Sequence, residues 1–272
     1  MSFSWKRRDC GVMGILNVTP DSFSDGGEHE EVERAVSRAL EMESQGAQLI
    51  DIGAESTRPG SLSVPPDRQW ERLEPVLRRL SGRLKVPLSV DTTWSSVAER
   101  AAGLGVVAVN DTSAGTDDPQ MFRMAAKLGL AMVLMHRKAL PEVMQSVATY
   151  EDVVREVGLH LVGRAREGLK AGLTMESICL DPGIGFGKTL EQNLALLREI
   201  PRLAATGHAV LVGLSRKSFL GTLTGETEPR RRDGASVAGA LAASRRGAQW
   251  VRVHAVDLTQ QALAVDKAVE AS

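Results

Sequence analysis

The sequence predicts an α/β fold, a single (β/α)8 TIM barrel that spans residues 1–272. Three observations favour this fold. Eight short apolar runs alternate with helical patterns, no linker-like or low-complexity segment divides the chain, and each apolar run ends in a polar residue. A doubly wound open sheet is the alternative. Such a sheet usually has fewer strands, and its GxGxxG nucleotide-binding turn is absent here.

Each predicted strand is a short apolar run that stops at a polar residue, and a loop follows it. This kind of junction lets side chains at the strand's end face a ligand. In chain order, the strands are expected at residues 10–18, 48–54, 87–91, 106–111, 131–136, 178–181, 209–215 and 250–256.

The segments between the strands carry apolar residues at helical spacing. Helices are expected at residues 32–44, 69–80, 95–102, 119–127, 150–171, 190–199, 235–245 and 258–269. Several of these segments end in a glycine, which we expect to adopt the left-handed backbone of a helix C-cap. These glycines are Gly46, Gly103, Gly129, Gly172, Gly207 and Gly247.

The composition excludes several classes of function. The net charge is −1, so no overall field draws the chain to nucleic acid or to a membrane, and no apolar run approaches the ~20 residues that span a bilayer. The N-terminus lacks a signal-peptide core. Cys10 and Cys179 lie in apolar runs, so we expect two reduced, buried thiols and a cytoplasmic protein. The histidines follow no zinc-binding spacing.

Polar residues mark the end of every predicted strand. In a barrel these ends converge on one mouth, where the active site lies. A loop residue or helix cap explains any single one of them more simply, but eight strand ends together favour a site. The residues are Asn17, Asp51, Glu55, Asp91, Asn110, Asp111, His136, Asp181, Ser215, Lys217, Arg252 and His254. Strand alternation places Arg252 and His254 on the inner face.

These side chains form two chemical groups. Asp91, Asn110 and Asp181 are hydrogen-bond acceptors, whereas Asn17, Arg58, Lys217, Arg252 and His254 are donors or cations. A matching ligand carries N–H donors at one end and negative charge at the other. The edge of a 2-amino-4-oxo pyrimidine, as in guanine or a pterin, suits the acceptors, and a phosphate or diphosphate suits the cations. Asn17 can reach a phosphate or complete a Mg²⁺ shell.

Residues 213–218, with the sequence Gly-Leu-Ser-Arg-Lys-Ser, close the seventh strand and open a helix. Free backbone N–H groups there, together with the Ser218 hydroxyl, form a seat for an anion. Simple helix capping explains the same residues equally well. Lys217 by itself also fits an ordinary surface lysine.

Six stretches of the chain closely resemble the dihydropteroate synthases. They are residues 13–27, 51–60, 150–154, 181–188, 215–218 and 252–254, and their order agrees across nearly the whole chain. The resemblance implies a pterin-binding TIM barrel, usually a homodimer. It also implies that the enzyme joins 6-hydroxymethyl-7,8-dihydropterin diphosphate to 4-aminobenzoate, with Mg²⁺, and releases diphosphate.

The resemblance also implies roles for individual residues. Asp91, Asn110, Asp181 and Lys217 would hold the pterin, and Arg252 would stack on it. Asn17, Arg58 and His254 would hold the diphosphate and its Mg²⁺. Phe23, Thr57, Pro59, Lys217 and Ser218 would frame the aminobenzoate, and Phe186 and Gly213 would also contact substrate. The residues expected to drive the reaction are Arg58, Lys217, Arg252 and His254.

The chain departs from the family pattern at three places. Arg137-Lys138-Ala139-Leu140-Pro141 stands where a Met/Arg-Gln/Gly-Thr-Pro stretch is usual, so a methionine contact to the pterin edge is not expected. Ala54 replaces a glycine. Ala255 replaces an aspartate that often follows the histidine, so a different group must orient His254.

Three other functions remain as alternatives. A pterin-binding methyltransferase with a corrinoid partner shares the barrel but gives no reason for residues 57–60 or for the anion seat. A non-catalytic pterin binder would be expected to lose Asn17, Lys217 or His254. A Schiff-base aldolase would use Lys217 as nucleophile, which requires surroundings that lower its pKa.

Overall fold

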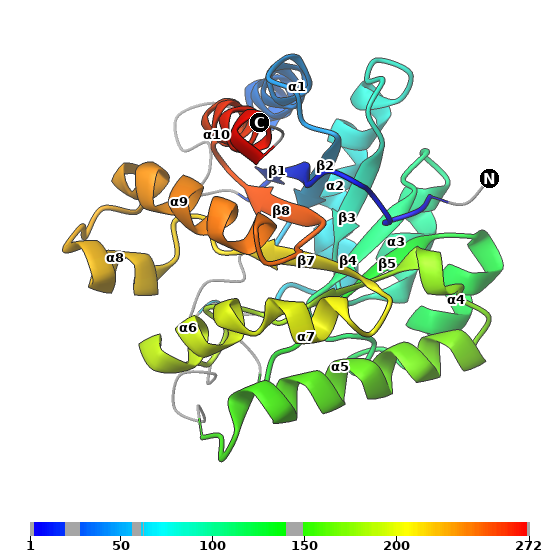
Figure 1. Ribbon diagram of the computed structural model, residues 1–272. Coiled ribbons are helices and arrows are strands. Elements are labelled where there is room, and N and C mark those ends of the chain that lie inside the picture. The colour runs from blue at the N-terminus through cyan, green and yellow to red at the C-terminus, as the bar shows by residue number, and fades with distance from the viewer. Residues whose placement is uncertain (1–2, 20–27, 56–60, 62, 140–148, 271–272) are drawn as a thin grey trace.

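A computed structural model describes residues 3–19, 28–55, 61, 63–139 and 149–270. Eight parallel strands pair in chain order, and β8 pairs with β1, so the sheet closes into a barrel surrounded by helices (Figure 1). The predicted fold class is therefore confirmed. The strands are β1 Gly11–Asn17, β2 Leu49–Gly53, β3 Leu88–Asp91, β4 Ala108–Asp111, β5 Ala131–Met135, β6 Ile178–Asp181, β7 Ala209–Gly213 and β8 Trp250–Val253.

The helices follow the predicted order. They are α1 Glu28–Ser44, α2 Pro66–Leu80, α3 Ser95–Ala102, α4 Met121–Leu128, α5 Val153–Lys170, α6 Leu190–Arg198, α7 Ile200–Ala204, α8 Ser218–Thr224, α9 Asp233–Ser244 and α10 Val256–Glu270. The 3-10 helices η2 Met175–Ser177 and η3 Pro229–Arg232 were not predicted. The expected helix at 190–199 continues as α7, because Pro201 sits in the first turn of a second helix, where its missing N–H costs nothing. Within the described residues, no helix is both long and apolar enough to cross a membrane.

One predicted glycine cap is wrong. Gly46, Gly129, Gly172, Gly207 and Gly247 all have positive φ, as expected for left-handed caps. Gly103 instead has a φ of −61° and continues the right-handed turn. Gly105, two residues later, takes the left-handed conformation with a φ of 93°. The sequence Gly-Leu-Gly offers two candidate positions, and the strand that follows decides between them.

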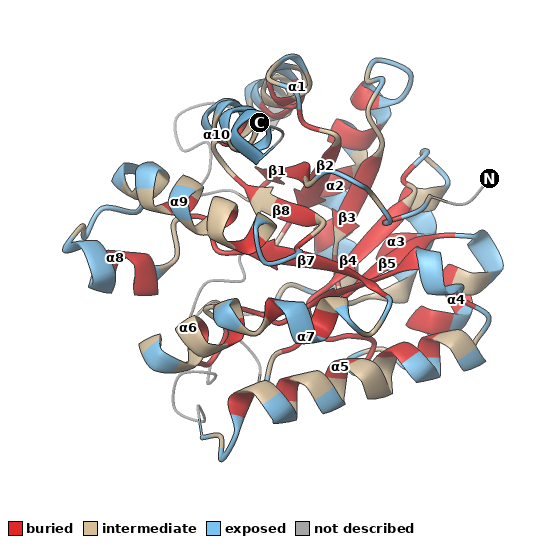
Figure 2. Ribbon diagram, viewed as in Figure 1, coloured by how far each residue is buried: buried red, intermediate tan, exposed pale blue. Residues whose placement is uncertain are grey.

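The barrel has an inner and an outer core, because alternate residues of each strand point to opposite sides. Figure 2 shows the strands as the buried centre, whereas the helices expose their outer faces. Val251 and Val253 belong to the outer core between strands and helices. The inner core holds Met13, Leu49, Ala108, Ala131, Val133, Cys179, Ala209, Leu211 and Trp250.

Both cysteines are free thiols, as predicted. Cys179 is buried in the barrel interior, and burial raises its pKa well above the ordinary value. Cys10 is only partly buried, so the expectation that both thiols are buried holds for Cys179 alone. Burial nevertheless raises the pKa of Cys10 to about 11. Neither thiol is therefore activated as a nucleophile.

Trp5 closes the amino-terminal end of the barrel. Its side chain is fully buried, and its ring meets that of Trp250 edge to face, with centroids 5.6 Å apart. Its indole N–H donates to the carbonyl of Ser177 at 3.1 Å, and its own carbonyl accepts from Trp250 Nε1 at 2.7 Å. This segment thus completes the inner core.

We expect Trp5→Ala to lower the free energy of unfolding by about 3–5 kcal/mol, because it leaves a large cavity and an unpaired Ser177 carbonyl. Urea denaturation followed by circular dichroism measures the loss. Since the site lies at the opposite end of the barrel, ligand affinity of the folded fraction should stay unchanged. A loss of less than about 1 kcal/mol in the free energy of unfolding would show that the segment around Trp5 contributes little to the stability of the barrel.

Candidate active site

Arg252 spans the mouth of the barrel. Its Nε donates to Asp51 Oδ2 and its Nη2 to Asp91 Oδ2, both at 2.7 Å. The arginine comes from β8, and the two carboxylates come from β2 and β3. Both ion pairs therefore pass across the end of β1, which lies between β8 and β2. Two carboxylates fix the orientation of the guanidinium plane. The predicted inward direction of Arg252 and Asp91 agrees with these contacts.

Asp51 organises this part of the site. Its side chain is fully buried and also accepts from Ser89 Oγ at 2.6 Å and from Asn110 Nδ2 at 2.9 Å. Because Asn110 Nδ2 donates to Asp51, the amide oxygen is the atom of Asn110 that can accept from a ligand. Asn110 therefore presents an acceptor, as predicted. Asp51 was predicted only as one of the polar strand ends, without a specific role in the site, and Ser89 was not predicted.

Asp181 and Lys217 form the opposite side of the site. Asp181 Oδ1 accepts from the Gly183 N–H at 2.7 Å, while Lys217 Nζ donates to the Ile184 carbonyl and lies 4.2 Å from the ring centroid of Phe186. Burial raises the pKa of Asp181, against the attraction of Lys217. Burial lowers the pKa of Lys217 to about 7. The two groups thus face each other in surroundings that disfavour charge.

Gly213 lies between these two sides of the site. A Cβ atom there would be 3.7 Å from Arg252 Cβ and 3.9 Å from Asp181 Oδ2, which is ordinary contact. The small residue leaves room beside both side chains.

The pKa of Asp91 is also shifted. Burial raises it to about 7, although the positive charge of Arg252 acts to lower it.

Lys188 supports the loop after β6 and was not assigned from the sequence. Its side chain is buried, and Nζ donates to the carbonyls of Gly183 at 2.8 Å and Phe186 at 3.0 Å. These bonds hold in place the loop that meets Lys217. Burial lowers the pKa of Lys188 to about 7. Lys188 is the last residue of the stretch 181–188 that resembles the family, and this position could have identified it as part of the site.

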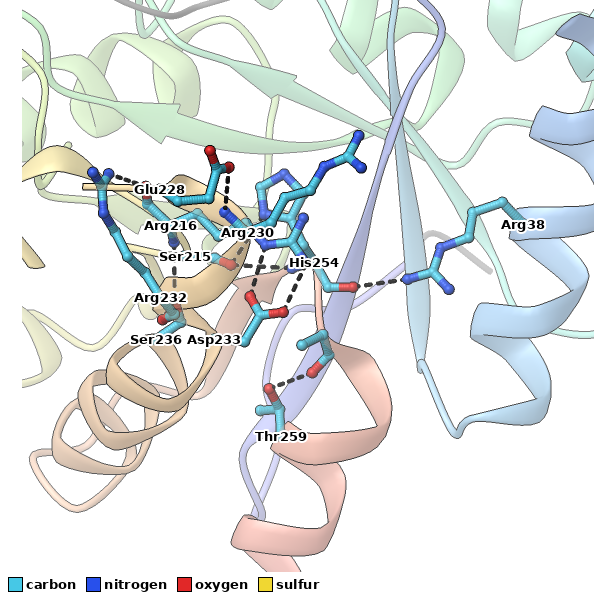
Figure 3. A network of polar contacts seen from close by, with 11 residues as sticks. Arg38, Ser215, Arg216, Glu228, Arg230, Arg232, Asp233, Ser236, His254 and Thr259 are labelled. Carbon is cyan, nitrogen blue, oxygen red and sulfur yellow. Dashed lines mark hydrogen bonds and ion pairs between the residues drawn. The ribbon is translucent and has the colours of Figure 1, made fainter. Parts of the chain in front are cut away.

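Ser215 orients His254. The serine Oγ lies 3.0 Å from His254 Nδ1 and accepts from the backbone N–H of His254 at 3.2 Å (Figure 3). On the far side of the histidine, Arg38 Nη2 donates to its carbonyl at 3.0 Å. The Ser215 hydroxyl therefore supplies the group that must orient His254 in the presence of Ala255.

Two of the predicted strand-end residues, Asp111 and His136, do not face the site, and a third, Glu55, is bound by a residue of α2. Glu55 accepts from Gln69 Nε2 at 2.6 Å. Asp111 points outward and holds its own loop by accepting from Ser113 and Gly115. Asp51 and Asn110 still bring polar groups from β2 and β4 to the mouth, so the expectation that every strand contributes one is wrong only for β5, where the predicted residue is His136.

His136 points to the outer side of the barrel. Its ring meets His160 of α5 edge to face, with centroids 5.0 Å apart. Burial lowers its pKa to about 3. Since alternate residues face inward, Val133 and Met135 occupy the inner positions of β5, and Met135 packs against Phe186. Counting alternation from Ala131 would have identified this.

The atypical segment begins with two cations whose side chains contact other residues of the chain. Arg137 forms an ion pair with Asp117 of the loop between β4 and α4. Lys138 Nζ lies 4.3 Å above the ring of Tyr150. The rest of the segment, from Leu140 onward, lies outside the described residues.

The remaining predicted residues lie at the edge of the site or outside the described part of the chain. Asn17 ends β1 and is partly exposed, and Ser218 is exposed as the first residue of α8. Phe23, Thr57, Arg58 and Pro59 fall outside the described residues. The described ranges contain no cluster of three His, Cys, Asp or Glu side chains that could hold a metal. A site that keeps waters and phosphate oxygens as ligands needs only one or two protein oxygens, so the Asn17 amide fits Mg²⁺ as a partial ligand.

A closed barrel with a buried carboxylate, arginine and lysine set at its carboxyl-terminal mouth defines an enzyme of the (β/α)8 class. The family model of pterin binding enzymes matches residues 13–254. A dihydropteroate synthase of Neisseria meningitidis serogroup C is 46% identical over 255 residues, which make up 93% of this chain and 90% of that protein. The chain therefore belongs to the pterin-binding enzymes and, within them, to the dihydropteroate synthase family, which makes it a transferase of folate biosynthesis.

Solved structures agree with this assignment. Xanthomonas albilineans dihydropteroate synthase with 4-aminobenzoic acid has a TM-score of 0.92 and 44% identity, covering 97% of this chain and 94% of that chain. The same enzyme in complex with 7,8-dihydropteroate has a TM-score of 0.88 and 42% identity, covering 97% and 95%. A Schiff-base aldolase also required a lowered lysine pKa, which Lys217 has, so family membership decides between the two functions.

Proposed function

We propose that this chain condenses 6-hydroxymethyl-7,8-dihydropterin diphosphate with 4-aminobenzoate to 7,8-dihydropteroate and releases diphosphate. The arrangement of acceptors around Arg252 is the observation that carries the proposal. Asp91, Asn110 and Asp181 offer carboxylate and amide oxygens near a guanidinium group that Asp51 and Asp91 hold in a fixed orientation. The relatives of known structure bind 4-aminobenzoic acid and 7,8-dihydropteroate, which matches both halves of this product.

The pterin would lie flat against Arg252. Its 2-amino-4-oxo edge carries N–H donors that pair with Asp181 and with the Asn110 oxygen. Asp51 keeps both Arg252 and Asn110 in orientation, so the site is ordered before ligand binds. Lys217 lies above Phe186 and would donate to an oxygen or ring nitrogen of the pterin.

The bond that breaks joins the pterin methylene to a diphosphate oxygen. The electron-rich dihydropterin supports positive charge on that methylene, so the leaving group can depart before the amine attacks. Arg58, His254 and the N-terminal end of α8 would stabilise the departing negative charge. Mg²⁺, held in part by Asn17, would supply further positive charge to the diphosphate. The arylamine is neutral at pH 7, so the reaction needs positioning more than a strong base.

Diphosphate release tests the proposal directly. The pterin diphosphate is incubated with the protein and Mg²⁺, with and without 4-aminobenzoate, and 7,8-dihydropteroate is followed by chromatography. Product that forms only in the presence of 4-aminobenzoate supports the function. Diphosphate release with no C–N bond formed, under saturating 4-aminobenzoate, would contradict it. Omitting Mg²⁺ tests the metal, and the expected result is loss of most activity.

We expect 4-aminobenzoate to bind weakly to the free protein and about 5- to 150-fold more tightly in the presence of diphosphate and Mg²⁺, a coupling of about 1–3 kcal/mol. Its seat draws on Phe23, Thr57 and Pro59, from loops that the diphosphate is expected to engage through Asn17 and Arg58. Calorimetric titration of 4-aminobenzoate with and without inorganic diphosphate measures the coupling.

Two controls accompany this titration. By reciprocity, 4-aminobenzoate should tighten diphosphate binding by the same factor. Arg58→Ala should remove the coupling and spare pterin binding, because Arg58 belongs to the diphosphate side. Equal 4-aminobenzoate affinities in both conditions would show that the seat is preformed.

We also propose that residues 1–272 act as a single pterin-binding domain, that two chains form a homodimer, and that the protein acts in the cytoplasm. Family resemblance supports the homodimer, and the free thiols support the cytoplasmic location. Sedimentation of the purified protein tests the oligomeric state.

A further inference from the structure

Arg216 separates two residues of the site and has an unusual backbone. It stands between Ser215, which contacts His254, and Lys217, which faces Asp181. Its φ of 61° lies in the left-handed region, where the Cβ of any residue except glycine crowds the following carbonyl. Because this φ sets the direction in which the chain leaves Ser215, it also sets where Lys217 and the start of α8 lie. A glycine would adopt it with less strain.

The start of α9 holds Arg216 in this conformation at three points. Asp233 accepts from Arg216 Nε at 2.7 Å and from Nη2 at 2.8 Å, which is a bidentate pair. The Arg216 N–H donates to Ser236 Oγ at 2.9 Å, and its carbonyl accepts from Arg232 Nη1 at 3.1 Å. Figure 3 shows these contacts together with the neighbouring hydrogen bond between Ser215 and His254.

The Ser236 and Arg232 contacts use backbone groups that any residue has, so the ion pair with Asp233 is the contact that requires an arginine at a position whose backbone favours glycine. The guanidinium points to Asp233 of α9, so it is not itself a ligand group of the mouth. We propose that Asp233 is a positioning residue for the reaction, which acts through Arg216 to place Ser215 and Lys217. The roles of His254 and Lys217 in this inference rest on the proposed function. Asp233 thus controls how diphosphate is held, while Asp91, Asn110 and Asp181 hold the pterin edge independently.

The test compares Asp233→Asn with Asp266→Asn. Asp266 Oδ1 accepts from Arg245 Nε at 2.6 Å, just past the other end of α9, so the control breaks a similar ion pair far from Arg216. We expect Asp233→Asn to lower kcat/KM for the pterin diphosphate by about 10- to 100-fold, as a displacement of site groups does. Affinity for a pterin without diphosphate should fall by less than about threefold, because Lys217 is only one of the side chains expected to hold the pterin, and Asp91, Asn110 and Asp181 stay in place. Asp266→Asn should leave both values near wild type.

A double variant shows whether Asp233 acts through Arg216. In an Arg216→Gly background, the backbone no longer needs the anchor and the ion pair is gone. Asp233→Asn should then cause no further loss of kcat/KM. An undiminished loss in that background, or wild-type kcat/KM in the single variant, would overturn the proposal. Equal losses of pterin affinity and kcat/KM would also overturn it, because they indicate general disorder of the mouth.

Two further measurements keep the result decisive. If Asp233→Asn does not fold, Ser236→Ala removes the anchor on the Arg216 N–H, and the same outcomes apply. Binding of inorganic diphosphate is also measured by calorimetry on every variant. If the wild-type protein shows no turnover, the proposed function is refuted, but the diphosphate affinities of the variants still test the role of Asp233. Diphosphate affinity should fall in Asp233→Asn and stay unchanged in Asp266→Asn. Unchanged affinity in both variants contradicts the role of Asp233.

Discussion

Asp181→Asn is expected to abolish measurable pterin binding and leave the barrel folded. One carboxylate oxygen of Asp181 is held by the Gly183 N–H at 2.7 Å, so the other oxygen is the one that can meet the ligand. The amide keeps the first bond but places an N–H donor against the N–H donors of the pterin edge. That mismatch costs at least about 1–3 kcal/mol, and more when the lost acceptor is charged. Calorimetry with a pterin and thermal unfolding measure the two effects.

Asp111→Asn is the matched control for this variant. Asp111 is also a buried carboxylate at the end of a strand, but it faces outward and accepts from Ser113 and Gly115. Its amide variant should lower the melting temperature and keep pterin affinity. Asp181→Asn should instead lose pterin affinity and keep its melting temperature. Wild-type pterin affinity in Asp181→Asn would remove Asp181 from the binding site.

Lys217→Met is expected to lower kcat/KM by about 10²- to 10³-fold and at the same time to stabilise the protein. The lysine ammonium lies in surroundings that lower its pKa to about 7, so the folded state bears the cost of burying a charge. Methionine has a similar shape and no charge. We expect a gain of about 1–3 kcal/mol in the free energy of unfolding near pH 7, discounted because the side chain is only partly buried.

The pH dependence of this gain has a definite sign. Below pH 7 the lysine is charged in both the folded and the unfolded chain, so its burial cost is complete. Between pH 7 and its ordinary pKa of 10.5, the unfolded chain binds more protons, and wild-type stability rises with pH. The advantage of Lys217→Met should therefore be largest below pH 7 and shrink toward pH 10. Urea denaturation of both proteins at pH 6, 8 and 9.5 tests this, and a gain that grows with pH would refute the lowered pKa.

Polar residues at the strand ends were enough to find most of the described site, namely Asp91, Asn110, Asp181 and Arg252. Alternation was used only to place Arg252 and His254 on the inner face, because side chains of one strand alternate with a period of two. The strand-end rule failed at β5, where the last polar residue, His136, was taken as inward. The phase of the strand puts Met135 inside instead. A polar strand end thus predicts a site residue only when its phase is also counted.

The sequence by itself determined the barrel, the order of its elements and the chemical types of the site residues. These depend on apolar periodicity, glycine positions and local motifs, all of which act over a few residues. Tertiary structure alone decided the partners. Asp51 meets Arg252, 201 residues away in the chain, and Asp233 holds the strained backbone of Arg216. The first pair arises only when the barrel closes, and the second only when α9 packs beside the loop after β7. Folding brings side chains of separate elements within hydrogen-bonding distance, and no local pattern encodes that distance.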